Sequence, residues 1–396
     1  MLKNKKIILL SILFIAVMSI SCTKSSQSDD SKNLKQYDDN NSIDQDVVKI
    51  GSIFAITGEA AEREVWFREQ LRFTIDVMNE KGGFLGKKIV LIEYDTQSTS
   101  IGAKVAADIA VKDGVIAAIG ASWSSHSIAA ANVFQEAKVI MISPDSTNPK
   151  VTQVGDYIFR TCFVDTDQGK AAAHFVKNDL NFSNAAILVN ISDEYSIGLA
   201  DIFENEFELI NGDILFHGDY THQSADFSDI LITIKELEPE VVYLPGRPAD
   251  IILVILQSLK LGIDTTFIGG DSWNDDKVLD FIRENEFKYY FTGPWTDPDV
   301  EDLEEYRFNE KSKNQFNTNN NGSLMIFDAI IVINEAINIA QSLNPEDIKN
   351  TIINTKSFRA YQGELIFNQY GDPIGLPTAV YKVNDEGIEV IKVLRY

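Results

Sequence analysis

Small hydroxyl and acidic side chains follow three predicted strands, where each strand ends. Ser124 comes just after residues 115–120, Thr147 follows residues 139–143, and Asp271 comes just after residues 266–269. Open α/β sheets bind ligands at the carboxyl ends of their strands. Ser124 also begins a predicted helix, where amide groups and a small hydroxyl suit an anion, whereas the acid at Asp271 suits a cation. The ordinary alternatives are a helix N-cap for Ser124, a turn residue for Thr147 and a loop cap for Asp271.

Two arginines could bring positive charge to the same place. Arg63 lies on the inner face of a predicted helix near its start, where a cation is disfavoured by roughly 0.3 to 1 kcal/mol. Arg247 follows the predicted strand 241–244, again at a carboxyl end. Paired arginines could hold a ligand carboxylate in a bidentate geometry. Surface pairing of these arginines with Glu62 or Asp250 is the alternative.

Motifs of the common catalytic and metal centres do not occur in the sequence. The histidines form neither a His-x-x-x-His pair nor a His-Glu-x-x-His motif: His126, His174, His217 and His222. No Gly-x-Ser-x-Gly, Walker loop or Gly-x-Gly-x-x-Gly follows a predicted strand. Residues 165–169 resemble a calcium loop only superficially, because the glycine is misplaced and the third acid is missing. Cys162 has no accompanying His or Asn arrangement and suits a buried packing site. We expect no enzyme activity, no metal and no cofactor.

Length and charge limit the possible classes of protein. The chain has 396 residues, of which 44% are hydrophobic, and this suffices for a large core in about two domains. A formal net charge of −24 repels phosphate backbones, so nucleic-acid binding is not expected. If Cys22 carries a lipid, Cys162 has no partner in the chain and no structural disulfide is available.

The first 46 residues are typical of an exported chain. Lys3, Lys5 and Lys6 precede an apolar run over residues 7–18, which is too short for a membrane span but suits a signal peptide. The run ends near Ser19-Ile20-Ser21-Cys22, which resembles a bacterial lipobox, although Leu is preferred at the first of these positions. Residues 1–22 are therefore predicted to be a lipoprotein signal peptide with Cys22 as the lipid anchor, and cleavage without lipid is the alternative. Residues 23–46 are polar and are predicted to be a flexible tether.

The rest of the chain alternates strands with helices. Seven apolar or β-branched runs predict buried strands at residues 47–56, 88–94, 115–120, 139–143, 185–189, 241–244 and 266–269. Between the first two, Trp66 or Phe67, Leu71, Ile75 and Met78 recur at helical spacing before Lys81-Gly82-Gly83. This alternation predicts an α/β fold with parallel sheets.

Several ordered sequence blocks together resemble one known family. The blocks are Phe54-Ala55-Ile56-Thr57-Gly58, residues 79–89 (NEKGGFLGKKI), Phe159-Arg160-Thr161, Gln168-Gly169, residues 141–149 (MISPDSTNP) and residues 269–273 (GGDSW). They are similar to blocks of the extracytoplasmic solute-binding proteins of branched-chain amino acid ABC transporters, the leucine, isoleucine and valine-binding family. The resemblance extends from about Val47 to the C-terminus.

The resemblance implies the type I periplasmic-binding fold, in which two Rossmann-like lobes are joined by three hinge crossovers. We expect these crossovers near residues 163–168, 292–297 and 362–372. The predicted N-terminal lobe then comprises residues 47–162 and 296–362, and the C-terminal lobe residues 163–295 and 363–396.

The resemblance also implies roles for individual residues. The side chains of Ser124 and Thr147 would bind the ligand carboxylate. The backbone carbonyl of Asp145 would accept a hydrogen bond from the ligand ammonium, and the Asp271 carboxylate would pair with it. Tyr195 matches the family's Tyr-Gly-x-Gly segment, whose ring closes over the ligand, although the first glycine is replaced here by serine; an ordinary packed tyrosine is the alternative.

The resemblance is weakest around the ligand side chain. Arg63 and Arg247 fall near positions where the family places aromatic rings, which brings an acidic or polar ligand into consideration beside leucine. Trp123 either lines the pocket or packs between the lobes.

We therefore expect a monomeric, membrane-anchored, periplasmic or cell-surface lipoprotein. It would capture an amino acid or similar small ligand between two lobes and deliver it to an ABC permease. One alternative is a ligand-sensing receptor of the same fold that acts on a signalling partner. A secreted hydrolase is the other, and the absence of a catalytic motif counts against it.

Overall fold

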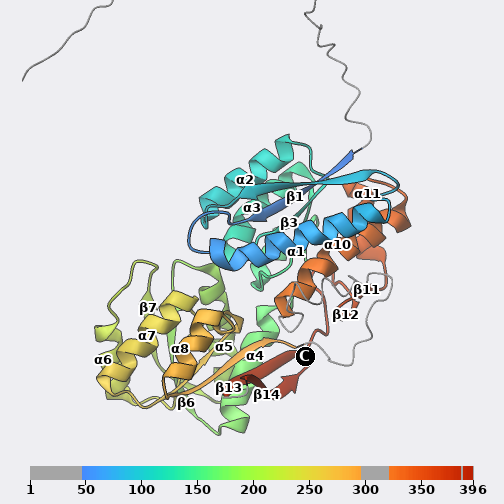
Figure 1. The fold of residues 1–396 in the computed structure, drawn as a ribbon. Coiled ribbons are helices and arrows are strands. Elements are labelled where there is room, and N and C mark those ends of the chain that lie inside the picture. The colour runs from blue at the N-terminus through green and yellow to red at the C-terminus, as the bar shows by residue number, and fades with distance from the viewer. Residues whose placement is uncertain (1–46, 296–320, 385–386, 396) are drawn as a thin grey trace, which may run out of the picture. The chain divides into compact units, whose positions relative to one another are not determined.

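The computed structural model describes residues 47–295, 321–384 and 387–395. Side chains are described for these residues except 321–324. The predicted signal peptide, lipid anchor and tether all fall within residues 1–46 and so lie outside the described residues. Within the described residues the chain forms two α/β lobes, each built on its own sheet (Figure 1).

The first sheet is parallel throughout and has the order β2-β1-β3-β4-β5. Its strands are β1 Val47–Phe54, β2 Lys88–Asp95, β3 Ala117–Gly120, β4 Ile140–Ser143 and β5 Ile158–Arg160. The helices packed with it are α1 Ala61–Glu80, α2 Ser100–Lys112, α3 Ser124–Ala137, α10 Asn321–Ala340 and α11 Pro345–Asn354, and a short 3-10 helix, η1, spans Pro149–Val154. We call this sheet and its helices the first lobe.

The second sheet has seven strands in the order β14-β13-β10-β9-β8-β6-β7. They are β6 Asn184–Asn190, β7 Asp213–Tyr220, β8 Val241–Tyr243, β9 Thr266–Gly269, β10 Lys288–Pro294, β13 Thr378–Asn384 and β14 Gly387–Leu394. The helices of this second lobe are α4 Asp165–His174, α5 Glu194–Leu209, α6 Ser228–Leu237, α7 Pro248–Leu261 and α8 Asp276–Glu284, with the short turns η2 Phe175–Asp179 and η3 Asp271–Trp273. A small antiparallel pair, β11 Phe358–Ala360 and β12 Gly363–Leu365, completes the described elements.

The predicted α/β fold and all seven predicted strands are confirmed, with ends that differ by at most two residues. The predicted parallel arrangement is confirmed throughout the first sheet and for most of the second, where only β13 pairs antiparallel, with both β10 and β14. Two residues separate β13 from β14, which is too short for the crossover that a parallel pair requires.

Helix α1 shows how the sequence pattern chooses the buried face. Phe67, Leu71, Ile75 and Met78 are all buried, whereas Trp66 is 51% exposed. The prediction left Trp66 and Phe67 open, and the structure assigns the core position to Phe67. Cys162 is also fully buried, as predicted, and burial raises the pKa of its thiol.

Successive side chains of the second sheet are buried on opposite faces, as expected for a sheet covered on both sides. Ala186, Leu188 and Val242 pack into one apolar cluster, and Ile187, Val189 and Tyr243 pack into another. The first lobe has a single large cluster that includes residues of α10 between 325 and 337. Figure 1 shows α10 beside α1, far away in the sequence.

The predicted lobe boundaries remain a prediction, and the packing favours one change to them. Leu365 and Leu376 pack into the cluster of the first lobe, whereas β13 belongs to the second sheet. We therefore place the third crossover between Leu376 and β13 instead of at residues 362–372. The predicted crossover at 292–297 lies partly outside the described residues.

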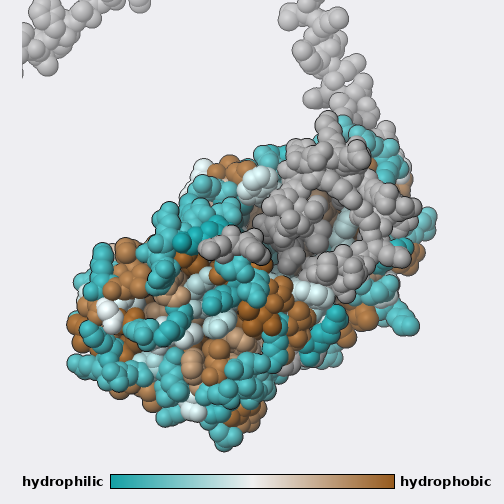
Figure 2. All heavy atoms as spheres, turned by 60° about the horizontal axis from the view of Figure 1, so that its bottom comes forward, coloured by the Kyte–Doolittle hydropathy of each residue, from teal (hydrophilic) through white to brown (hydrophobic). Residues whose placement is uncertain are grey.

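On the face shown in Figure 2, hydrophilic residues cover most of the described surface and smaller hydrophobic areas lie among them. Among the described helices, none is by itself long and apolar enough to cross a membrane. The pair Met325–Ala340 and Pro345–Asn354 passes such a test only when taken together, and it is bent by 101°.

Candidate functional site

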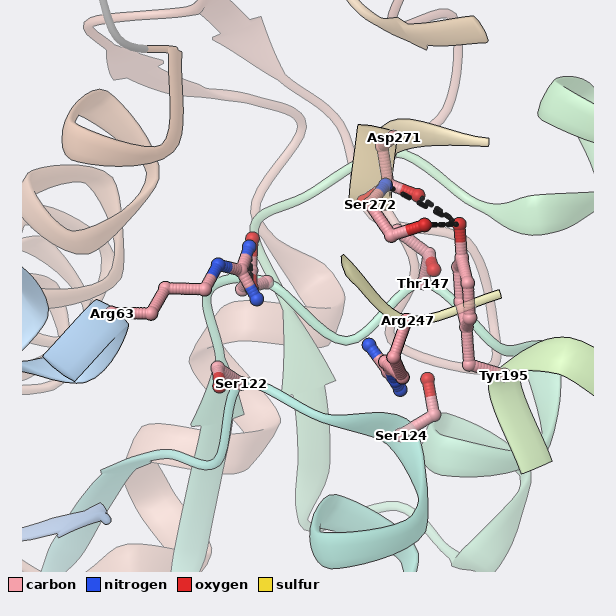
Figure 3. Close-up of a pocket in the computed structure, with 9 residues that line it drawn as sticks. Arg63, Ser122, Ser124, Thr147, Tyr195, Arg247, Asp271 and Ser272 are labelled. Carbon is pink, nitrogen blue, oxygen red and sulfur yellow. Dashed lines mark hydrogen bonds and ion pairs between the residues drawn. The ribbon is translucent and has the colours of Figure 1, made fainter. Parts of the chain in front are cut away.

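A small polar pocket brings together most of the residues singled out from the sequence (Figure 3). Its walls are formed by Arg63, Ser122, Ser124, Asp145, Thr147, Tyr195, Arg247, Asp271 and Ser272. Seven of the eight predicted ligand-binding residues are in this set. Trp123 is not, and Ser122 and Ser272 are additions that the sequence reasoning missed.

Every lining residue follows the carboxyl end of a parallel strand. In the first lobe, Arg63 follows β1, Ser122 and Ser124 follow β3, and Asp145 and Thr147 follow β4. In the second lobe, Tyr195 follows β6, Arg247 follows β8, and Asp271 and Ser272 follow β9. The strand ends of both sheets therefore meet at one site, the position at which open α/β sheets bind ligands.

Ser124 is the first residue of α3, not its N-cap. The N-cap is Trp123, which makes no capping hydrogen bond through its side chain. The Ser124 hydroxyl instead accepts a hydrogen bond from the backbone N–H of Asn148, at 3.3 Å. The N-cap alternative for Ser124 is thus wrong, and its hydroxyl links the loops that follow β3 and β4.

Ser122 is held from behind by a buried acid. Its hydroxyl donates a hydrogen bond to Glu64, which also accepts one from the backbone N–H of Ala55. Burial is the main reason that the pKa of Glu64 is raised, and the hydrogen bonds act in the opposite direction. One signal for Ser122 was available beforehand, namely its position two residues before Ser124.

Arg63 forms an ion pair with Asp145 across the pocket wall. The distance between Arg63 Nη2 and Asp145 Oδ2 is 3.0 Å, and the Arg63 guanidinium also lies 5.6 Å from the centre of the Phe67 ring. Burial raises the pKa of Asp145 and Arg63 partly offsets this effect. Glu62, the alternative partner considered for Arg63, pairs with Lys277 instead.

Arg247 is buried and fixed on three sides. Its Nε and Nη2 donate to the two carboxylate oxygens of Asp193, at 2.6 and 3.2 Å. The rings of Trp123 and Tyr195 lie 4.5 and 4.6 Å from its guanidinium carbon. Surface pairing with Asp250 is therefore wrong, since Asp250 contacts only the backbone N–H of Arg247.

Asp193 couples Arg247 to both lobes. Besides Arg247, it accepts hydrogen bonds from the Ser125 hydroxyl of the first lobe and from the backbone N–H of Tyr195, as the N-cap of α5. Burial alone would raise the pKa of Asp193, but Arg247 and the hydrogen bonds from Ser125 and Tyr195 together outweigh burial, and the pKa is lowered. Asp193 thus remains ionised.

Trp123 supports the pocket from outside its lining. It is 8% exposed, packs with Ala55 and Ala60, and lies against the ring of His126. Because His126 is buried close to Arg247, its pKa is lowered to about 4 and its ring stays neutral at pH 7. Of the two roles open for Trp123, the structure favours packing, here against a pocket arginine contributed by the other lobe.

Asp271 lies at the centre of a polar network in the second lobe. Its carboxylate accepts hydrogen bonds from the Tyr195 hydroxyl, at 2.9 Å, and from Gln168 Nε2, at 3.1 Å. The Tyr195 hydroxyl also lies 3.2 Å from the Ser272 hydroxyl, and burial together with Asp271 raises the pKa of Tyr195. Tyr195 is therefore more than a packed ring, because it orients the acid that faces the pocket.

Gln168 and Asp165 extend this network into the interior. Gln168 Nε2 donates to Asp165 Oδ1 as well as to Asp271, and Gln168 Oε1 accepts from the backbone N–H of Asp271. The other oxygen of Asp165 has no hydrogen-bond partner within the described part of the chain. Burial and the nearby Asp271 raise the pKa of Asp165 to about 7. Gln168 was within a block that carried the family resemblance, but its contact with Asp271 was not visible in the sequence.

The described residues contain no group of three or more His, Cys, Asp or Glu side chains placed to hold a metal ion. What the pocket offers is hydroxyls, carboxylates and guanidinium groups. Such an arrangement can bind a small ligand that carries both positive and negative charge.

Comparison with known proteins agrees with this arrangement. The chain is 30% identical over 225 residues to the leucine-specific-binding protein of Salmonella typhimurium, a stretch that covers 57% of this chain and 61% of that protein. The matched stretch thus spans about three-fifths of that relative. A Leu/Ile/Val-binding protein homologue of Brucella melitensis is 27% identical over 333 residues, which cover 82% of this chain and 87% of the relative.

Solved structures agree over a longer part of the chain. The leucine-binding protein LivK of Thermotoga maritima superposes with a TM-score of 0.79 at 28% identity, covering 88% of this chain and 98% of that one. The LivJ protein of Streptococcus pneumoniae in complex with isoleucine has the same fold, with a TM-score of 0.77 at 22% identity and coverage of 88% and 100%. Residues 47–387 match the sequence profile described as periplasmic binding protein, and the chain therefore belongs to the periplasmic binding protein family.

Proposed function

We propose that the protein is the substrate-binding component of an ABC transporter. It captures an amino acid or a similar small ligand reversibly between its two lobes and delivers it to a membrane permease. The observation that carries the proposal is the pocket at the strand ends of both lobes, which combines groups for a ligand carboxylate with groups for a ligand ammonium. The relatives named for leucine, isoleucine and valine binding support the same class of ligand.

The carboxylate end of the ligand is assigned to the first lobe. Ser124 and Thr147 line the pocket with hydroxyl groups, and α3 begins at Ser124, so that the positive end of its dipole faces the same space. A buried carboxylate without such partners would cost several kcal/mol.

The ammonium end is assigned to Asp271 of the second lobe. Its carboxylate is fixed by Tyr195 and Gln168, and it needs no large rearrangement to meet a cation. Asp145 offers a further carboxylate and a backbone carbonyl from the first lobe. Because Ser124 and Thr147 belong to the first lobe and Asp271 belongs to the second, one ligand would bridge both lobes.

Contacts between the lobes near the pocket suit a closing movement. The Ser125 hydroxyl donates to Asp193, and Lys150 pairs with Glu194 at 2.8 Å. Both contacts are polar, and the Lys150–Glu194 pair is exposed, so that breaking this pair costs little. They can re-form each time that the lobes close on a ligand.

Calorimetry tests the proposal directly. The purified chain is titrated with each of the twenty amino acids and with common dicarboxylates, and we expect saturable binding of at least one. An Asp271→Asn variant should bind that ligand about 10- to 100-fold more weakly, because the ammonium loses a charged partner. Absence of binding across the whole panel refutes the amino-acid assignment. Uptake of the same ligand in a reconstituted transporter tests delivery to a permease.

We further propose that Cys22 is lipidated and anchors the protein outside the cytoplasm, with residues 23–46 as the tether. A tether of this kind raises the effective concentration of the binding lobes near a permease. Mass spectrometry of the mature N-terminus should find a lipid on Cys22, and Cys22→Ala should release the protein from membranes. An unmodified N-terminus in the mature chain contradicts the anchor.

A further inference from the structure

Among the described residues, those that line the pocket form no apolar wall for an aliphatic ligand side chain. Its lining consists of two arginines, two aspartates, four hydroxyl residues and one tyrosine. Burying a leucine side chain against these groups would desolvate them without replacing their hydrogen bonds. The ligand side chain should therefore be polar, and this inference rests on the function proposed above.

Arg247 presents an unused hydrogen-bonding edge. A guanidinium carries five N–H groups, and Asp193 accepts from two of them, one on Nε and one on Nη2. Among the residues that the structure describes, none accepts a hydrogen bond from Nη1. The edge formed by Nη1 and Nη2 has two parallel N–H groups, the geometry that a carboxylate accepts in bidentate fashion.

The position of this edge is fixed before any ligand arrives. Trp123 and Tyr195 cover the guanidinium, and Asp193 holds the adjacent edge formed by Nε and Nη2. A side chain held in this way loses little conformational entropy on binding. Figure 3 shows Arg247 and Arg63 extending from opposite sides toward the same space.

The two arginines are close enough to repel each other. The charge of Arg247 acts to lower the pKa of Arg63, although the nearby aspartates more than offset this effect and burial. An anionic group between the two guanidinium groups would remove this repulsion.

Four helices add positive potential to the pocket. Arg63, Ser124 and Tyr195 lie in the first turns of α1, α3 and α5, and Arg247 is the N-cap of α7. Each N-terminus is equivalent to roughly half a positive charge, which Asp193 partly offsets at α5 and Asp250 partly offsets at α7. The remaining positive potential acts against the negative charge of the aspartates that pair with the arginines.

We propose that the ligand is a small dicarboxylic amino acid whose side-chain carboxylate binds the Nη1–Nη2 edge of Arg247, with Arg63 on its other side. The neutral amide of the same size is the nearest competitor, because it offers one acceptor in place of two. Specificity for the acid over its amide is thus the property that this site provides.

Titration calorimetry with L-glutamate, L-aspartate, L-glutamine, L-asparagine and L-leucine tests the proposal on the full chain. We expect one of the two acids to bind at least about tenfold more tightly than its amide and than leucine. Tighter or equal binding of leucine or of an amide overturns the dicarboxylate assignment but leaves the proposed function standing. Absence of binding by all five, and by the remaining amino acids, overturns both.

A variant of Arg247 tests whether the acid is recognised by the geometry of the guanidinium group or only by its positive charge. Arg247→Lys keeps the positive charge but removes the two parallel N–H groups of the guanidinium. The ratio of acid to amide affinity should therefore fall about 10- to 100-fold. Arg72→Lys is the matched control, because Arg72 pairs with Glu93 in an exposed place outside the pocket lining and should leave the ratio unchanged. An unchanged ratio in Arg247→Lys overturns the assignment.

A second variant covers the case in which Arg247→Lys does not fold. The Arg63 side chain is 31% exposed, so that Arg63→Gln is expected to fold. It should lower the ratio of acid to amide affinity about threefold or more, since a partly exposed charge contributes less. An unchanged ratio in a folded Arg63→Gln protein contradicts the placement of the second carboxylate between the two arginines.

Discussion

Asp165 should make the protein less stable as the pH rises through the range from about 4 to about 7. Its carboxyl group is fully buried, and Asp271 lies nearby. Among the residues that the structure describes, none donates a hydrogen bond to one of its two oxygens. Burial and Asp271 raise its pKa from 3.8 to about 7. In this range the folded protein keeps a proton that the unfolded chain has lost, so that the free energy of unfolding falls with pH.

The size of this effect follows from the difference in pKa. A rise from 3.8 to about 7 is about three pKa units, and about 1.4 kcal/mol for each unit makes at most about 4 kcal/mol. The full contribution of the protonated group is present below about pH 4 and is lost above about pH 7. Asp165→Asn removes the titration while it keeps the size and shape of the side chain.

Equilibrium denaturation of both proteins from about pH 4 to about pH 8 measures the effect. The variant should gain stability relative to the wild type as the pH rises, by at most about 4 kcal/mol over the whole range. Only the difference between the two proteins matters, since the other titrating groups are common to both. Asp201→Asn, at an exposed position of α5, is the control for the exchange of an acid for an amide. Parallel curves for wild type and Asp165→Asn would refute a raised pKa at this position.

Three further predictions concern single contacts. Tyr195→Phe removes the hydroxyl that donates to Asp271 at 2.9 Å, and calorimetry should show ligand binding about tenfold weaker without loss of the fold; unchanged affinity would mean that this hydroxyl does not orient the acid. Arg160→Met leaves Asp372 and the carbonyls of Ser146 and Asn148 without their buried donor. Denaturation should therefore show that the free energy of unfolding falls by about 3 to 5 kcal/mol, whereas a decrease below about 1 kcal/mol contradicts the reasoning. Lys277→Ala breaks only an exposed ion pair with Glu62, and the melting temperature should stay within error of wild type; a marked decrease would show that this pair couples the lobes.

The sequence predicted well what depends on neighbouring residues. Ser124, Thr147 and Asp271 could be placed at the site because each follows a short apolar run, and the carboxyl ends of parallel strands meet at one edge. Phe67 could not be chosen over Trp66, since adjacent apolar residues fit a helical period equally well. The antiparallel pairing of β13 was readable in principle, from the two residues between β13 and β14.

Contacts between distant segments were beyond the reach of the sequence. Arg247 pairs with Asp193, 54 residues away, and Arg63 with Asp145, 82 residues away. Both arginines have closer acids in the sequence, and local reasoning favoured those as surface partners. The arrangement of the two sheets determines which acids pair with these arginines, because it places their side chains next to loops that follow other strands.

The order in which the chain completes its two cores has a consequence for synthesis. The cluster of the first lobe needs residues 325–337 of α10, and the second sheet needs β13, whose Ala379 and Val380 pack into the clusters on its two faces. A nascent chain therefore lacks part of each core until its last quarter has been made. Folding should be a late and cooperative event, and a ribosome-bound fragment ending before Asn321 should remain sensitive to proteases even though it already contains every residue of the pocket.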